Sequence, residues 1–457
     1  MKSSIFKIVR PGINGEGIAY QNRRPVFIPG AFVSETVKAE ILEENDSYAR
    51  ARVLSVITPA RSRCASPCNE ACTACPWISM RYEEQLRLKK QLLCEAVYKY
   101  GNVRDTFVRE IRPSQDLLHY RSACKLPVAE RNGLAVTGMY LPGTNHFIEI
   151  KDCPVHDEKL EAIRKTVLAI LHEEHFPAFD GSHGLRYLVM RRIDEKIQIA
   201  LITGRDVIPS SLVQKLSQLS EVTSLAQSVN TEKNSVSLFG SQAVTLAGLP
   251  YLEVKFCGFD LRLSAESFFQ LNLTQAEALY RTAISKIDPC GVLLEAYCGV
   301  GVMSILAKDR ARKIFGIESI PQAVENAKIN ADLNRVPNVT FLCDDAAHGL
   351  AELSKTTEID TLLADPPRAG MDEAMITAIL ASKIKKIVYI SCNPATLGKN
   401  IGALKRDFVL QTIIPFDMFP NTAHVESIAV LTRVGTSDRI KKDKKDRRRK
   451  KRKNHAL

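Results

Sequence analysis

The second half of the chain alternates short apolar runs with stretches whose apolar residues recur at helical spacing. Apolar runs of this length indicate buried strands, and helices between them favour a parallel sheet. Helical patterns separate the first five pairs of runs but not the last pair, which predicts an antiparallel hairpin at the sheet edge. The fold class is therefore α/β, a doubly wound, Rossmann-like sheet of seven strands. The predicted strand cores are GVLLEAYC, KIFGIE, VTFLC, IDTLLAD, KKIVYIS, FVLQTII and ESIAVLTRV.

The first half of the chain has a different pattern. Residues 1–57 form short β-rich segments broken by Gly, Pro and Asn-Arg turns, which suits a small five-stranded β-barrel of a kind that often binds RNA. Residues 81–101 have helical spacing, and strands with one helix at 156–174 predict an α+β middle domain. We expect four parts with the boundaries 1–57, 58–264, 265–435 and 436–457.

Composition narrows the class of protein. The 457 residues are 45% hydrophobic and 25% charged, as in ordinary globular chains, and no apolar run is long enough to cross a bilayer. We expect a cytoplasmic protein, with no membrane partner and no obligate protein partner. The net charge is +12, and residues 439–453 alone hold twelve Lys/Arg against two Asp. This basic tail is either an arm that binds phosphates or a solubilising extension.

Twelve cysteines in a chain without secretory features favour metal binding or catalysis over disulfides. Cys64, Cys68, Cys72 and Cys75 lie within twelve residues. Their spacing alone leaves iron–sulfur and zinc equally open.

The first predicted strand of the α/β domain runs into Tyr297-Cys298-Gly299-Val300-Gly301. Glycines after such a strand allow the backbone to approach a bound nucleoside. The next strand ends in Glu318, where a carboxylate can accept both ribose hydroxyls. Because the third glycine of a dinucleotide motif is absent, the pattern favours S-adenosylmethionine over a dinucleotide.

Two later strands end in residues that suit base chemistry. Asp365-Pro366-Pro367-Arg368 ends strand four, where a rigid loop can hold a flat base, and Cys392 ends strand five in Ser-Cys-Asn-Pro. A thiolate that adds to carbon 6 of a pyrimidine makes carbon 5 nucleophilic enough to take a methyl group. A base must then remove the carbon-5 proton, and Glu426 lies at the start of the last strand.

The motifs ESFFQLN (266–272), YCGVG (297–301), DPPRAG (365–370), SCNP (391–394) and HVE (424–426) resemble, in this order, the bacterial RNA uracil-C5 methyltransferases. The likeness is greatest to the iron–sulfur 23S ribosomal RNA enzymes with an N-terminal TRAM domain, which residues 1–57 resemble. The resemblance implies a methyltransferase domain over 265–435. It also implies catalysis by Cys392 and Glu426 through a covalent adduct with uracil.

The resemblance extends to cofactors. It implies contacts with S-adenosylmethionine from Gln270, Tyr297, Glu318, Asp345 and Asp365. One departure is Glu295-Ala296 before Tyr297, where the family commonly has Asp.

The resemblance also implies a 4Fe-4S cluster, with zinc as the alternative, held by Cys68, Cys72, Cys75 and Cys153. The Cys68–Cys72 spacing is two residues short of the family pattern, and the Gly-Gly before the third cysteine is missing, which leaves Cys64 as an alternative to Cys68.

The resulting prediction is methylation of carbon 5 of a uridine in 23S ribosomal RNA. Transfer RNA is the alternative substrate, because the sister enzymes share the catalytic motifs. Two other classes stay open: an RNA-binding assembly factor without activity, and an amino-group methyltransferase that uses Asp-Pro-Pro but needs no cysteine.

Overall fold

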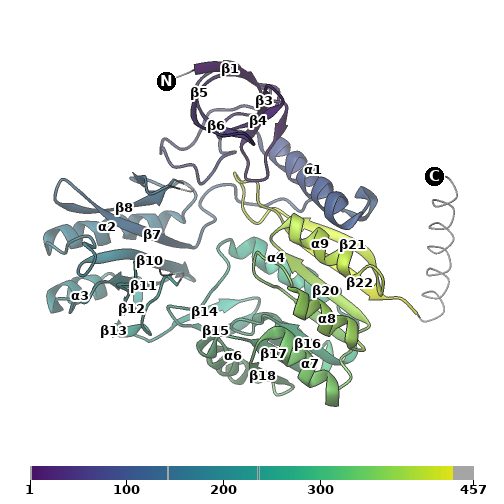
Figure 1. Cartoon of the computed structure of the whole chain (residues 1–457). Coiled ribbons are helices and arrows are strands. Elements are labelled where there is room, and N and C mark those ends of the chain that lie inside the picture. Colours follow the sequence, from purple (N-terminus) through teal and green to yellow (C-terminus); the bar gives the residue numbers. More distant parts are fainter. Residues whose placement is uncertain (1–2, 142–143, 234, 236, 436–457) are drawn as a thin grey trace. The chain divides into compact units, whose positions relative to one another are not determined.

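The structure is a computed structural model that describes the chain except for residues 1–2, 142–143, 234, 236 and 436–457 (Figure 1). The predicted basic tail, 436–457, lies outside the described residues. None of the helices within the described ranges is long and apolar enough to span a membrane. The chain divides into two compact units. The first unit comprises Met1–Lys89, Pro113–Glu277 and Asp417–His424, and the second comprises Lys90–Arg112, Ala278–Phe416 and Val425–Leu457.

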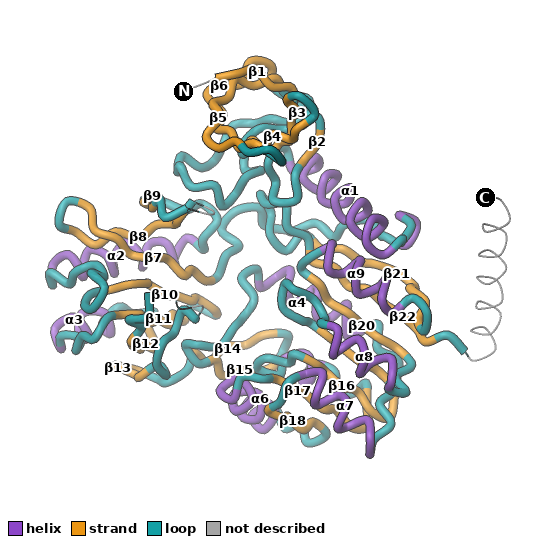
Figure 2. The backbone as a smooth tube through the Cα atoms, viewed as in Figure 1, coloured by secondary structure: helices purple, strands orange, loops and turns teal. Residues whose placement is uncertain are grey.

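The N-terminal part of the first unit is a small barrel whose strands form a ring (Figure 2). Its strand order is β1-β5-β6-β4-β3-β2, one strand more than the five predicted, because the two-residue β2 pairs with β3. Alternate residues point inward and form an apolar core that includes Val26, Ile28 and Val37. The strands are β1 (Ser3–Lys7), β2 (Arg10–Pro11), β3 (Gly17–Gln21), β4 (Arg24–Ile28), β5 (Thr36–Glu44) and β6 (Ala49–Thr58).

The cysteine-rich segment after β6 has little regular structure but is tied to the barrel. The indole Nε1 of Trp77 donates to the carbonyl of Gly15 at 2.9 Å, and Trp77 is buried. Helix α1 (Tyr82–Gly101) follows, as the helical spacing of 81–101 predicts, and its residues are shared between the two units.

The middle of the first unit is an α+β fold, as predicted. Its seven-stranded sheet has the order β13-β12-β11-β10-β7-β8-β9. Helix α2 (Glu158–Glu173) confirms the helix predicted at 156–174, and Asp157 caps it by accepting from the Leu160 N–H at 2.9 Å. A second short helix, α3, was not predicted. The remaining elements are β7 (Ala123–Arg131), β8 (Leu134–Tyr140), β9 (Phe147–Glu149), β10 (Leu185–Ile193), β11 (Lys196–Thr203), α3 (Ser210–Ser217), β12 (Val222–Val229), β13 (Val244–Gly248), and the hairpin β14 (Leu252–Phe256) with β15 (Phe259–Leu263).

A loop from late in the chain, 417–424, also belongs to the first unit. The carboxylate of Asp417 forms an ion pair with Lys89, and both side chains are fully buried. Asn421 Oδ1 accepts from Gln85 Nε2 at 3.1 Å, and its N–H donates to Gln85 Oε1 at 2.8 Å. The loop is therefore held by α1 just before the chain reaches Val425 and Glu426.

The second unit is the predicted doubly wound domain. Its sheet order is β18-β17-β16-β19-β20-β22-β21, parallel except for β22, which is antiparallel to both neighbours. The predicted closing hairpin is thus confirmed, with β21 at the edge. Helix α4 is shared with the first unit. The elements are η1 (Asp105–Phe107), α4 (Leu273–Ser285), β16 (Cys290–Ala296), α5 (Val302–Leu306), β17 (Ala311–Glu318), α6 (Pro321–Leu333), β18 (Val339–Cys343), α7 (Ala346–Thr356), β19 (Thr361–Ala364), α8 (Glu373–Ala381), β20 (Lys386–Ser391), α9 (Pro394–Leu404), β21 (Phe408–Phe416) and β22 (Glu426–Arg433).

Candidate active site

The turn after β16 has the tight backbone that its glycines predict. Tyr297 has a φ of 64°, which is uncommon for a bulky residue and indicates a constrained turn. Gly301 has a φ of 81°, and a Cβ there would lie 2.6 Å from the ring of Phe341. A side chain at Gly301 would therefore push this turn away from the sheet.

Glu318 is fixed against the same turn. One carboxylate oxygen accepts the N–H of Gly299 at 3.1 Å, and the other accepts the N–H of Ile320 at 3.0 Å. This contact places the Glu318 carboxylate beside the glycine turn, and its contact with the cofactor ribose stays a prediction. A carboxylate held by backbone donors keeps its position without a cation.

The loop at the end of β19 is fastened to the start of α9. Asn393 Nδ2 donates to the carbonyl of Arg368 at 3.2 Å. Asn400 Oδ1 accepts from the N–H of Met371 at 3.1 Å, and its Nδ2 donates to the Met371 carbonyl at 2.7 Å. These hydrogen bonds, in addition to the two prolines, make the loop rigid. The sequence analysis missed Asn400, because an asparagine inside a helical pattern gives no signal of its distant partner.

Cys392 and Glu426 are brought together by strand pairing. In the β20–β22 ladder Ser391 pairs with Ser427, so the next residue, Cys392, comes opposite Glu426. Cys392 follows the end of β20 and Glu426 begins β22. Because β22 runs in the opposite direction, both residues lie at the carboxyl ends of the parallel strands. Cys392 is half-buried, and Glu426 is buried. Asn393 caps α9 by accepting from the N–H of Ala395 at 3.0 Å, so the Asn-Pro after the cysteine starts a helix.

Cys392, Glu426 and Asp365 all have raised pKa values at these strand ends. Burial raises the pKa of Cys392 to about 11, and the charges of Glu426 and Asp365 act in the same direction. Arg368 opposes this shift. Burial raises the pKa of Glu426 to about 8, with a further contribution from Asp365. Burial raises the pKa of Asp365 itself to about 7. Perturbed acids gathered at the end of a parallel sheet are typical of an active site.

Glu295 explains the departure at the end of the first strand of the sheet. Its side chain is buried, and it accepts a hydrogen bond from the Ser304 hydroxyl at the start of α5. Burial raises the pKa of Glu295 to about 8, and Asp365 and Glu318 add to the shift. The Glu295 side chain thus links the end of β16 to α5, the helix that follows the glycine turn.

Two predicted cofactor residues are placed differently from the rest. The carboxylate of Asp345 caps α7 by accepting from the N–H groups of Ala347 at 3.0 Å and His348 at 3.1 Å. Gln270 lies in the first unit, where its carbonyl accepts from the Ser122 hydroxyl at 3.5 Å. The contacts of both residues with a cofactor stay predictions.

The four predicted metal ligands come from two segments of the first unit: Cys68, Cys72 and Cys75 from one, and Cys153 from the other. The thiols lie near enough for the charge of one to raise the pKa of another. Burial raises the pKa of Cys75 to about 12, and Cys153, Cys72 and Cys68 contribute to that shift. Within the described residues, however, no three or more His, Cys, Asp or Glu side chains are arranged as a metal site. The predicted cluster is therefore not confirmed by this geometry.

Comparisons with known proteins identify the family of the chain. The family described as tRNA (Uracil-5-)-methyltransferase matches residues 81–434, and the TRAM domain matches residues 7–54. An RNA methyltransferase of Clostridium tetani is 33% identical over 93% of this chain and 95% of its own. One of Listeria innocua is 32% identical over 92% of this chain and 95% of its own.

A solved structure shares the fold. The tRNA (uracil-54, C5)-methyltransferase of Pyrococcus abyssi, in complex with S-adenosyl-L-homocysteine, superposes with a TM-score of 0.76. It is 24% identical, and the match covers 94% of this chain and 99% of that one. The chain belongs to the tRNA (uracil-5-)-methyltransferase family and is an S-adenosylmethionine-dependent RNA (uracil-5-)-methyltransferase with an N-terminal TRAM domain.

Proposed function

We propose that the protein methylates carbon 5 of a uridine through a covalent bond between Cys392 and the base. The observation that carries this proposal is the strand register that sets Cys392 opposite Glu426, beside Asp365. Thiol, carboxylate and loop lie at the edge where α/β enzymes bind their substrates. The inactive assembly factor considered above would need none of these groups in register.

The chemistry assigns one role to each group. The Cys392 thiolate adds to carbon 6 of uracil, and the electrons of the 5,6 double bond move toward the carbonyl at carbon 4. Carbon 5 then attacks the methyl group that S-adenosylmethionine supplies, and the bond from that methyl to sulfur breaks. Glu426 takes the proton from carbon 5, the double bond returns, and the thiolate leaves. Arg368 is the nearby cation that favours the thiolate.

For the cofactor we propose contacts from the predicted set. The support is the rigid turn of Tyr297, the fixed carboxylate of Glu318 and the burial of Asp365 at neighbouring strand ends. In this assignment Glu318 accepts the ribose hydroxyls. Gln270 and Asp345 complete the proposed set.

For the cysteines we propose a 4Fe-4S cluster held by Cys68, Cys72, Cys75 and Cys153, with zinc as the alternative metal. The charge of Cys153 raises the pKa of each of the other three thiols, so the four thiols are near one another, which supports this ligand set. Cys64 is exposed and is not among those groups, so Cys68 is favoured as the first ligand. Measurement of iron, sulfide and zinc in protein purified without oxygen decides between the metals, and the Cys64→Ser variant should keep the metal.

For the substrate we propose 23S ribosomal RNA, on the resemblance to the iron–sulfur ribosomal enzymes. Transfer RNA is the second candidate, because the Pyrococcus abyssi protein that shares the fold over nearly the whole chain is a transfer RNA enzyme. In either RNA the target base has to leave its stack to reach Cys392.

The test uses 5-fluorouridine, whose fluorine cannot leave carbon 5 as a proton does. The protein is incubated with S-adenosylmethionine and substituted fragments of 23S ribosomal RNA or substituted transfer RNA, and the products are separated on a denaturing gel. We expect a slow-migrating adduct that the Cys392→Ala variant does not form. An adduct with transfer RNA alone would change the substrate. Absence of an adduct with both, together with methylation by Cys392→Ala, would favour amino-group chemistry.

A further inference from the structure

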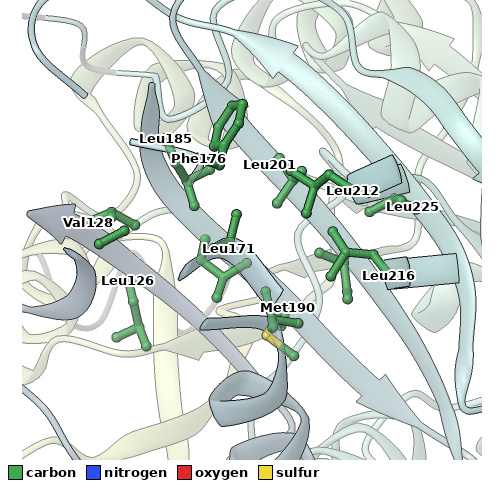
Figure 3. Packing of buried hydrophobic residues seen from close by; sticks show 14 of the residues in the cluster. Leu126, Val128, Leu171, Phe176, Leu185, Met190, Leu201, Leu212, Leu216 and Leu225 are labelled. Atoms are coloured by element: carbon green, nitrogen blue, oxygen red, sulfur yellow. The ribbon is translucent and has the colours of Figure 1, made fainter. Parts of the chain in front are cut away.

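The two faces of the seven-stranded sheet in the first unit pack in different apolar clusters. Leu126 and Met190 pack with Leu171 of α2 and Leu212 of α3 in the large core, which also includes Leu188 (Figure 3). Because successive residues of a strand point to opposite faces, Lys125 and Arg191 point to the other face. That face has its own small cluster, which includes Val189, Ala200 and Ala265.

Arg191 and Lys125 line a small pocket on this second face. The strand register pairs Arg191 with Ala123 on β7, which makes Lys125 its diagonal neighbour two residues further on. On the other side, Arg191 pairs with Gln198 of β11. The pocket is lined by Ala123, Lys125, Val189, Met190, Arg191, Gln198, Ala200 and Ala265.

Arg191 is a buried cation without a carboxylate. Only three Lys or Arg side chains are buried in the part of the chain that the structure describes. Lys89 is paired with Asp417 and Arg164 with Glu161, whereas no carboxylate within ion-pair distance of Arg191 is found among the described residues. Its Nη2 donates to the Ser267 carbonyl at 2.5 Å, and its Nη1 donates to Gln198 Oε1 at 3.4 Å.

Two guanidinium groups act on Lys125 as like charges. Partial burial lowers the pKa of Lys125, and the charges of Arg191 and Arg121 lower it further. Burial also lowers the pKa of Arg191, to about 10. A buried charge without a partner is costly to a fold, so two neighbouring cations without an acid indicate a site whose anion comes from outside.

We propose that the pocket of Lys125 and Arg191 binds a backbone phosphate of the RNA substrate. This inference rests on the proposed action on RNA and names a contact that the catalytic groups do not supply. Arg191, which donates to the Ser267 carbonyl and to Gln198, offers its other N–H donors to a phosphate oxygen. Lys125, which is exposed, contacts the same phosphate.

The test measures RNA binding by the full-length protein over a range of salt concentrations. The probes are transcribed fragments of 23S ribosomal RNA and unmodified transfer RNA. We expect Lys125→Gln and Arg191→Gln each to weaken binding about 10-fold at low salt. Each should lower the slope of log K against log salt by about 0.7 to 1, as the loss of one phosphate contact does. The double variant should lower the slope no further, because both residues hold one phosphate, and Arg191→Lys should recover part of the affinity.

Arg192→Gln is the matched control. Arg192 is the next residue on β10, and its guanidinium already pairs with Asp157 at 3.0 Å and Glu221 at 3.4 Å. The substitution removes the same charge and should leave the slope unchanged. If Arg191→Gln does not fold, Lys125→Gln alone still decides, because that residue lies at the surface.

Two outcomes would overturn the phosphate site. One is a salt slope that is the same in Lys125→Gln as in the unaltered protein. The other is weaker binding of S-adenosylmethionine with unchanged RNA binding, which would assign the pocket to the cofactor carboxylate. Failure of the proposed chemistry is seen separately, as absence of the 5-fluorouridine adduct in a protein whose RNA binding is intact.

Discussion

Two buried carboxylates, Glu35 in the first unit and Glu426 in the second, have opposite environments. In the first unit Glu35 is fully buried, and burial alone would raise its pKa, but hydrogen bonds from Arg63 and from the N–H groups of Phe32 and Ala60 hold it below the usual range. In the second unit burial raises the pKa of Glu426 to about 8, and no basic side chain opposes the shift.

The difference separates carboxylates that hold the fold from those that carry out chemistry. A carboxylate with its own cation contributes to stability as long as it is ionised. A buried carboxyl group without a cation contributes less to stability as the pH rises, and groups with such raised pKa values are typical of sites that transfer protons. Substitutions that remove the carboxylate or its cation partner test this distinction.

The largest effect is expected from Glu426→Gln. The amide cannot take the carbon-5 proton, so turnover should fall by about 10²- to 10⁴-fold, the range that a general base contributes. Unlike a structural lesion, this change should let the adduct form and accumulate with ordinary uridine RNA, as a denaturing gel would show. The control is Glu373→Gln, an exposed acid in the first turn of α8, which should turn over normally.

The stability of Glu426→Gln gives a second readout. A carboxyl group whose folded pKa is raised stabilises the fold below its unfolded pKa, and this contribution is lost as the pH rises through about 8. The variant should therefore resist urea better than the unaltered protein at pH 9. Free turnover by this variant, or a loss of stability at that pH, would contradict the role.

The opposite result is expected from a paired carboxylate. Lys89→Met leaves Asp417 buried without its cation and should lower the free energy of unfolding by about 3 to 5 kcal/mol. The single tryptophan, Trp77, donates its backbone N–H to the Asn421 carbonyl in the loop that contains Asp417, so its fluorescence should report unfolding of this region. Lys89→Met combined with Asp417→Leu should recover much of the loss, because no charge then stays unpaired.

The neighbouring residue supplies the control. Lys90 pairs with Glu110, whose side chain is 86% exposed, so Lys90→Met should change the free energy of unfolding by less than about 1 kcal/mol. Equal losses for Lys89→Met and Lys90→Met would mean that burial of the ion pair has no bearing on stability.

The sequence predicts the sheet of the second unit well because its signals are local. Apolar runs define the strands, and strand ends place Glu318, Asp365 and Cys392 at one edge. The contacts that Asn400 makes with Met371, and the burial of Arg191, depend on residues that meet only after folding. Neither the spacing nor the type of such residues reveals their partners.

The smallest effect is a change in the pH dependence of turnover. Glu426 must be ionised to accept a proton, so with a pKa of about 8 the rate of adduct breakdown should rise with pH, by up to about tenfold per unit below pH 8. The charge of Asp365 contributes to that pKa. Asp365→Asn should therefore move the midpoint of the profile to lower pH, even where it weakens cofactor binding.

Adduct formation, which depends on the Cys392 thiol with its pKa of about 11, can be followed separately in single-turnover reactions. A midpoint that stays the same in Asp365→Asn would mean that the charge of Asp365 does not affect the pKa of Glu426. The difference in pKa between Glu426 and Glu35 would then owe nothing to Asp365, and burial alone would raise the pKa of Glu426.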